Sequence, residues 1–111
     1  MQEEIERLLF EAQRSRLSER RTEARHTFVR PVRITLPHGP EVPAFSKDIS
    51  AQGIGVICAT AISVGALATM EIHSTKGEPV FLRCEARWCD PFGKGWFLIG
   101  FKFIGTGARP T

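Results

Sequence analysis

Residues Pro79–Cys89 have the sequence PVFLRCEARWC, in which side chains of two kinds alternate along the chain. One side of the stretch carries Leu82, Cys84, Ala86 and Trp88. The other side carries Phe81, Arg83, Glu85 and Arg87. Because successive side chains of a β-strand point to opposite faces, this period of two predicts a strand with one buried face.

Further short runs rich in β-branched and aromatic residues lie on both sides of this strand, separated by turn residues. The strands expected there are Thr27–Leu36 with a break at Pro31, Val42–Ile49, Gly53–Ala59, Ala66–His73 and Trp96–Ile104. Six short strands at this spacing predict a mainly β fold, a small six-stranded antiparallel β-barrel. Closure of the barrel removes the exposed edges that an open sheet would leave.

The stretch Ile49–Met70 contains no charged residue and, as a helix, would be long enough to span a bilayer. It is only moderately apolar, however, and its glycines fall where turns would separate strands. We therefore expect two strands here and no insertion into a membrane.

The beginning of the chain, from Gln2 to about Leu17, has apolar side chains at helical spacing, with acidic residues early and arginines late. The apolar positions are Ile5, Leu8, Leu9 and Ala12. This pattern predicts an N-terminal amphipathic α-helix whose apolar stripe packs against its own domain. The alternative is a contact of this helix with another subunit, which would form a homodimer, or with a partner protein.

A length of 111 residues with 42% hydrophobic content predicts one globular domain with a single modest core. We expect an N-terminal helix and lead-in at 1–19, a barrel domain at 20–104 and a flexible tail at 105–111. Between Arg14 and Arg33 there are seven arginines and only two acidic residues, Glu19 and Glu23. This local excess of guanidinium groups predicts an anionic ligand.

The three cysteines, Cys58, Cys84 and Cys89, form no Cys-x-x-Cys pair, so we expect free, buried thiols in a reducing cytoplasm. The histidines are too scattered to indicate a metal site, and no pair of nucleophile and base is visible. No secretory pattern opens the chain. These observations predict a cytoplasmic protein that is not an enzyme and that needs no metal and no cofactor.

Two motifs carry the candidate binding chemistry. Arg21 and Arg25 form Arg-x-x-x-Arg before the first strand, and Asp48, Ser50 and Gly53 form Asp-x-Ser-x-x-Gly in the turn after the second. Two guanidinium groups can hold phosphate oxygens and the O6 and N7 acceptors of guanine. A carboxylate complements the N1–H and N2–H donors of guanine, Ser50 can donate or close the turn, and Gly53 permits a positive φ or a close approach. The arginines alone fit a solvated basic loop better than a ligand site, and Asp-x-Ser-x-x-Gly alone fits an ordinary turn equally well. The two motifs together fit a guanine nucleotide.

The two motifs, in this order, resemble those of the PilZ family, the bacterial receptor domain for the second messenger cyclic di-GMP. The resemblance covers roughly residues 20–104 and extends to Gly53-Ile54-Gly55-Val56 and Ile99-Gly100-Phe101-Lys102-Phe103. Arg16 and Arg20 have the same spacing as the arginine pair, but the family places its pair beside the first strand. The resemblance implies that cyclic di-GMP binds between the N-terminal segment and the barrel. The implied site residues are Arg20, Arg21, Arg25, Asp48, Ser50 and Gly53.

Arg20, directly before the pair, would be a third cation and would suit two stacked ligand molecules. The function implied is that of a receptor that changes the position of its N-terminal segment on binding and signals to a downstream partner protein. The alternatives are a small basic barrel that binds single-stranded nucleic acid, or an adaptor that binds no ligand. Trp88 and Trp96 are expected to be barrel side chains, unless one of them lies beside the ligand.

Overall fold

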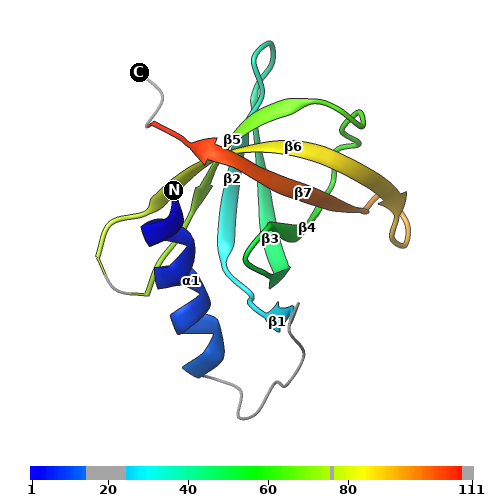
Figure 1. Cartoon of the computed structure of the whole chain (residues 1–111). Helices are drawn as coiled ribbons and strands as arrows, with labels where there is room; N and C mark the ends of the chain where they lie inside the picture. Colours follow the sequence, from blue (N-terminus) through cyan, green and yellow to red (C-terminus); the bar gives the residue numbers. More distant parts are fainter. Residues whose placement is uncertain (15–24, 76, 109–111) are drawn as a thin grey trace.

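The computed structural model describes residues 1–14, 25–75 and 77–108 of the chain. In this part of the chain an α-helix, α1 (Gln2–Arg14), precedes the strands. The strands are β1 (His26–Thr27), β2 (Pro31–Thr35), β3 (Glu41–Ile49), β4 (Gly53–Cys58), β5 (Leu67–Ile72), β6 (Val80–Pro91) and β7 (Phe97–Thr106). The strands curl around one core, and α1 lies against one end of it (Figure 1).

The sheet closes on itself. Its strand order is β1-β3-β2-β5-β6-β7-β4, and an additional pairing of β3 with β4 joins the two sides. All of these pairings are antiparallel. Strands β2 to β7 therefore form a closed six-stranded antiparallel barrel with an N-terminal helix, as the sequence predicts, and β1 is an extra short strand on β3.

The expected first strand, Thr27–Leu36, is divided into β1 and β2. Pro31 begins β2, where its missing N–H removes no bond from the middle of a ladder. The uncharged stretch Ile49–Met70 contains β4 and part of β5, which confirms the two predicted strands. No helix among the residues that the structure describes is both long and apolar enough to cross a membrane.

The core is filled by the inward-facing residues of the barrel strands. Leu82, Cys84 and Ala86 of β6 are completely buried, in agreement with the alternation in the sequence. Cys58 and Cys84 are free and buried, and Cys89 is free and half-buried. Burial raises the pKa of Cys84 to about 12, so this thiol is neutral and acts as an apolar core group.

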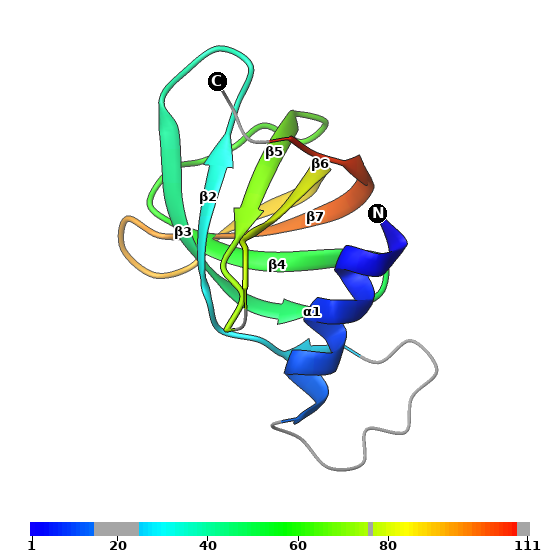
Figure 2. The same ribbon diagram turned by 90° about the vertical axis from the view of Figure 1, so that its left-hand side faces the viewer.

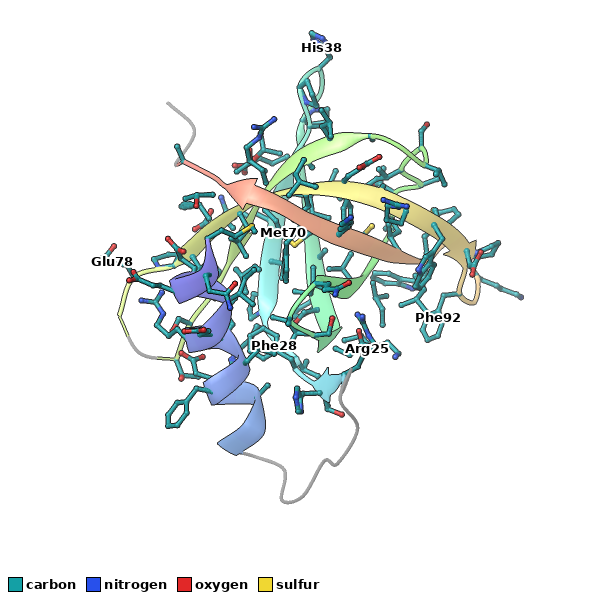
Figure 3. All side chains as sticks on the ribbon, viewed as in Figure 1. Arg25, Phe28, His38, Met70, Glu78 and Phe92 are labelled. Atoms are coloured by element: carbon teal, nitrogen blue, oxygen red, sulfur yellow. The ribbon has the colours of Figure 1, made fainter. Side chains whose placement is uncertain are left out.

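Helix α1 is part of the same core. Its apolar stripe, formed by Ile5, Leu8 and Ala12, is at most 2% exposed and packs into the cluster of barrel side chains. The helix thus covers its own domain, at the opposite end from the β2–β3 hairpin whose tip is marked by His38 (Figures 2 and 3). Phe10, on the outer side of the helix, is 61% exposed.

Polar contacts also hold α1 to the barrel. The buried carboxylate of Glu11 accepts hydrogen bonds from the Ser74 hydroxyl and the Thr75 amide, and it lies 3.3 Å from Nη2 of Arg30. Burial alone would raise the pKa of Glu11, but these hydrogen bonds and the charge of Arg30 outweigh it and lower the pKa. Arg30 also lies over the Phe28 ring, 4.5 Å from its centroid.

Because the helix stripe is core, Leu8→Ala should lower the free energy of unfolding by about 2–5 kcal/mol, as in other large-to-small core changes. Phe10→Ala on the same helix is the matched control, and it should change stability by no more than about 0.5 kcal/mol. Urea unfolding followed by circular dichroism measures both. Equal, small effects of the two variants would contradict the packing of α1 as core.

Candidate functional site

Four residues form one row across the outer face of the barrel. The strand register places Asp48 of β3 opposite Gly55 of β4, Gly55 opposite Gly100 of β7, and Gly100 opposite Trp88 of β6. The row thus begins at the aspartate of the sequence motif and ends at a tryptophan. Between them lie two residues without side chains.

Each end of the row follows an irregularity in its strand. The β3–β4 register shifts between Ser46 and Asp48, and the β6–β7 register shifts between Ala86 and Trp88. In both strands the residues two and four positions earlier point into the barrel, so uninterrupted alternation would turn Asp48 and Trp88 inward as well. A β-bulge adds one residue to the strand and so reverses the alternation of inward and outward side chains beyond it. Both side chains therefore lie on the outer face.

The positions of the two tryptophans differ from those expected from the sequence. Trp88 was expected on the inner face of its strand, and Trp96 was expected to be a barrel side chain. They are 42% and 48% exposed, respectively. For Trp88 the cause is the bulge, which the alternation of residue types in the sequence does not reveal.

The two glycines of the row make room for their neighbours. A Cβ atom on Gly55 would lie 2.8 Å from Oδ1 of Asp48, and one on Gly100 would overlap the indole of Trp88. The carboxylate and the indole therefore lean over the row from its two ends. Glycine at these two positions permits this close approach; neither position has a positive φ, so the backbone conformation does not itself favour glycine there.

Arg25 joins the two sequence motifs. Its Nε and Nη2 donate hydrogen bonds to Oδ1 of Asp48 over 3.1 and 2.7 Å, and its Nη1 donates to Oγ of Ser50 over 3.3 Å. Nζ of Lys47 lies 2.9 Å from the other oxygen of Asp48. The arginine is thus held on the rim of the barrel by the aspartate and the serine of the second motif.

The pKa of Asp48 is lowered. Partial burial would raise it, but hydrogen bonds from Lys47 and Arg25, together with their charges, have the larger combined effect. Asp48 is therefore ionised at neutral pH and acts only as a hydrogen-bond acceptor.

Ser50 and Gly53 shape the turn between β3 and β4. Oγ of Ser50 accepts hydrogen bonds from the amides of Gln52 and Gly53, each over 3.3 Å, so this serine closes the turn as an ordinary turn residue would. Gly53 has no positive φ, but a Cβ atom there would overlap the carbonyl oxygen of Phe101 on β7. Of the two roles predicted for Gly53, the close approach of backbones is therefore the one that applies.

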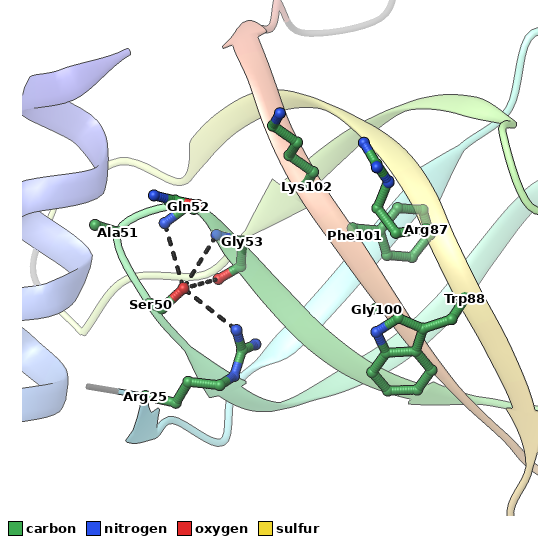
Figure 4. A pocket seen from close by; sticks show the side chains of 10 residues that line it. All are labelled: Arg25, Ser50, Ala51, Gln52, Gly53, Arg87, Trp88, Gly100, Phe101 and Lys102. Atoms are coloured by element: carbon green, nitrogen blue, oxygen red, sulfur yellow. Dashed lines mark hydrogen bonds between the residues drawn. The ribbon is translucent and has the colours of Figure 1, made fainter. Parts of the chain in front are cut away.

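An open cleft of about 610 Å³ lies beside this cluster. This volume is within the range of about 300–1,000 Å³ usual for small-molecule sites. Arg25 and Ser50 stand on one side of it and Arg87 and Trp88 on the other (Figure 4). The described residues that line the cleft are Arg25, Ser50, Ala51, Gln52, Gly53, Arg87, Trp88, Gly100, Phe101 and Lys102.

The structure brings together Arg25, Asp48, Ser50 and Gly53 from the predicted site. Asp48 is not among the residues that line the cleft, but it is paired with Arg25, which is. Arg20 and Arg21 lie outside the residues that the structure describes. The far wall of the cleft consists of Arg87, Trp88, Gly100 and Lys102. The sequence analysis did not name Arg87, Gly100 or Lys102 as site residues, and it named Trp88 only in the alternative that one tryptophan lies beside the ligand. Gly55 and Gly100 within strand patterns were an available signal of close approach, whereas nothing in the alternation identified Trp88.

The chemistry of this site is that of binding. Cationic side chains on two sides and an exposed indole line the cleft, and the ionised carboxylate of Asp48 is paired with Arg25 at its edge, a set suited to an anion that also carries a flat ring. Within the described ranges, no group of three or more His, Cys, Asp or Glu residues could hold a metal ion.

The fold and the site together define a small closed β-barrel with an open cleft on its outer face. Residues 19–109 match the family model described as the PilZ domain. The chain therefore belongs to the PilZ family.

Among solved structures, the chain is similar to one described as Bacillus subtilis inhibitor of motility (MotI/DgrA). The TM-score is 0.63 and the sequence identity is 21%, over 82% of this chain and 45% of that chain. A likeness at this identity shows a shared fold, and this chain spans less than half the length of that protein. Among curated proteins, none matches this chain.

The lowered pKa of Asp48 implies a pH-dependent contribution to stability. A carboxyl whose pKa is depressed in the folded state stabilises that state above its unfolded pKa of about 4, and this contribution is lost as the pH falls through the folded value. Wild type should therefore exceed Asp48→Asn in free energy of unfolding at neutral pH, and the difference should shrink below about pH 4. Urea unfolding at several pH values measures this difference, and one that stays constant or grows at low pH would contradict the ion pair.

Proposed function

We propose that this chain is a receptor module for cyclic di-GMP and not a catalyst. The observation that carries the proposal is the meeting of Arg25, Asp48 and Ser50 at the edge of the cleft. The two motifs that resemble those of the PilZ family are far apart in sequence, yet their side chains bond to each other.

The ligand chemistry fits these groups. Cyclic di-GMP carries two phosphates and two guanine bases, and the cleft offers guanidinium groups at Arg25 and Arg87 and an ammonium at Lys102. A guanidinium group can bind phosphate oxygens in pairs or the O6 and N7 edge of guanine. An ionised carboxylate complements the N1–H and N2–H edge.

Binding would require an exchange of partners. In the structure Arg25 is paired with Asp48, with side-chain exposures of 47% and 21%. Ion pairs this exposed contribute only about 0–1 kcal/mol, so a phosphate or a guanine can displace the pair at small cost. We propose that Arg25 turns to the ligand and that the carboxylate behind it becomes available to guanine.

We further propose that the signal passes through the N-terminal side of the molecule to a partner protein. Arg25 directly precedes β1, which contacts α1, and Arg30 a few residues later pairs with Glu11 of the helix. A movement of Arg25 would therefore change the contacts that hold α1 to the barrel. In its new position this segment would form the surface that a partner protein binds.

One observation favours a second candidate, the binding of single-stranded nucleic acid. Trp88, Phe92 and Trp96 are each more than 40% exposed, and Arg87 and Lys102 lie on the same outer face as Trp88. Exposed aromatics among cations are typical of proteins that stack successive bases. Such binding would depend strongly on salt and on oligonucleotide length.

Isothermal titration of the whole chain with cyclic di-GMP, beside GTP and cyclic di-AMP, tests the first proposal. We expect selective binding that falls by about tenfold or more in Arg25→Ala and in Asp48→Ala, because each loses charge-assisted hydrogen bonds. The matched control is Arg33→Ala, since Arg33 is also an exposed arginine paired with a carboxylate, that of Glu41 at 3.2 Å. Its affinity should equal that of the wild type.

The same titration gives the stoichiometry. Two ligands per chain would support Arg20 as the third cation for a stacked pair, and one ligand per chain would exclude that role. No binding of cyclic di-GMP at millimolar concentration, together with salt-dependent binding of oligonucleotides, would overturn the receptor proposal in favour of the second candidate.

A further inference from the structure

We infer that the hairpin between β6 and β7 is a peripheral membrane-contact site that binds the headgroup region of a bilayer rich in anionic lipid. The site is formed by Phe92, Lys94 and Trp96, called the hairpin tip below. This inference goes beyond the proposed function and does not depend on it, because none of the three is among the described residues that line the cleft. The contact lies at headgroup depth and needs no spanning segment.

The two aromatic side chains of the hairpin tip stay largely exposed. Phe92 is 47% exposed and Trp96 is 48% exposed. The amide of Phe92 donates a hydrogen bond to the Trp96 carbonyl over 2.8 Å, so the two residues lie opposite each other across the hairpin. Gly93 and Gly95, both with positive φ, turn the chain between them. Two large apolar side chains are therefore presented together at the end of the hairpin.

The hairpin tip projects from the barrel on the side away from α1. Two views of the ribbon show this hairpin, drawn in orange, at the edge of the molecule far from the helix (Figures 1 and 2). Phe92 lies on the same side (Figure 3). A bilayer surface can therefore meet the tip without a clash with the helix.

The apolar surface continues from the tip onto the barrel. The register places Leu98 of β7 opposite Ile57 of β4, and Ile57 opposite Phe45 of β3. Leu98 and Ile57 are half-buried, and Phe45 is 56% exposed. With Phe92 and Trp96, three aromatic side chains of about 200 Å² are each about half exposed, which gives roughly 300 Å² of apolar surface. Exposed patches of this size commonly mark an interaction site.

The distribution of charge favours an anionic surface. Lys94 lies at the turn between the two aromatic residues, and Arg87 and Lys102 lie on the same outer face in the neighbouring cleft. Asp90, at the base of the hairpin, offsets only one of these charges. On the far side, α1 carries four glutamates and two arginines. An anionic bilayer should therefore attract the hairpin tip and repel the helix, which sets the orientation of the molecule.

The chemistry of the hairpin tip fits lipid better than other occupants. Aromatic rings and lysine suit the boundary between acyl chains and headgroups, because the rings enter the apolar layer while the lysine stem lets its ammonium reach the phosphates. A second copy of this chain would bring the cationic sides of two molecules together, at an electrostatic cost. A nucleic acid strand needs successive stacking platforms along its length, whereas the tip offers one aromatic pair.

Cosedimentation of the whole chain with vesicles tests the inference. The chain should bind vesicles of equal parts phosphatidylglycerol and phosphatidylcholine, bind phosphatidylcholine alone about tenfold more weakly, and dissociate as salt is added. Phe92→Ala and Trp96→Ala should each weaken binding to the mixed vesicles by about tenfold, and Lys94→Ala by about fivefold. Phe10→Ala is the matched control, because Phe10 is 61% exposed but lies on α1, and this variant should bind as the wild type does.

Tryptophan fluorescence gives a second measurement. In Trp88→Phe, Trp96 is the sole tryptophan, and its emission should move to shorter wavelength when mixed vesicles are added, because the indole enters an apolar layer. Lys94→Glu keeps both aromatic side chains and should also lose vesicle binding, so the test does not depend on the aromatic variants alone. The thermal unfolding midpoint of each variant verifies that it folds.

The outcomes are distinct. Absence of binding to mixed vesicles at low salt, or equal binding by Trp96→Ala and the wild type, would overturn the inference. Without vesicle binding, a dimer in sedimentation equilibrium that Trp96→Ala abolishes would assign the surface to a second copy, and oligonucleotide binding lost in that variant would assign it to nucleic acid. Lys94→Ala should bind cyclic di-GMP as the wild type does, so failure of this inference leaves the receptor proposal standing.

Discussion

A closed barrel fixes which side chains point inward, and two bulges in this barrel decide where the candidate site lies. Regular alternation in β3 and β6 would direct the Asp48 carboxylate and the Trp88 indole into an apolar interior. For the carboxylate this would carry the high cost of an unpaired buried charge. The register shifts after Ser46 and after Ala86 place both side chains outside, at the two ends of one row of paired residues. Gly55 and Gly100, in the middle of that row, leave room for the carboxylate and the indole to lie close to the sheet.

The segment between Arg25 and Pro31 connects the site to the helix. Arg25 at its beginning bonds to Asp48 and Ser50, and Arg30 near its end pairs with the buried carboxylate of Glu11. Between them the hydroxyl of Ser46 donates to the Phe28 carbonyl and accepts from the Arg30 amide, which fixes the segment against β3. One short segment, held to its neighbours by hydrogen bonds, therefore contacts both the edge of the cleft and the C-terminal part of α1. The proposed transmission of a binding signal depends on this arrangement.

Most of the fold could be predicted from the sequence, because it depends on periodicity. The alternation in Pro79–Cys89, the helical spacing of Ile5, Leu8 and Ala12, and the turn residues between strands each define an element by local physics. The bulges could not be predicted in this way, because a single inserted residue leaves no mark in residue type. For this reason Trp88 was assigned to the wrong face. The pairing of Arg25 with Asp48 also does not follow from local sequence patterns, because the two motifs come together only when β1 pairs with β3.

The central claim, that the ligand lies on the outer face from β3 to β6, is tested most directly by a two-dimensional amide NMR titration of the chain with cyclic di-GMP. The account predicts the largest shifts at Arg25, at residues 50–53, at the Trp88 indole N–H and at Gly100. The tip of the β2–β3 hairpin, marked by His38, lies at the opposite end from α1 and serves as an internal reference that should shift little. Shifts concentrated at that hairpin tip, or no shifts at the β3–β4 turn, would contradict the account.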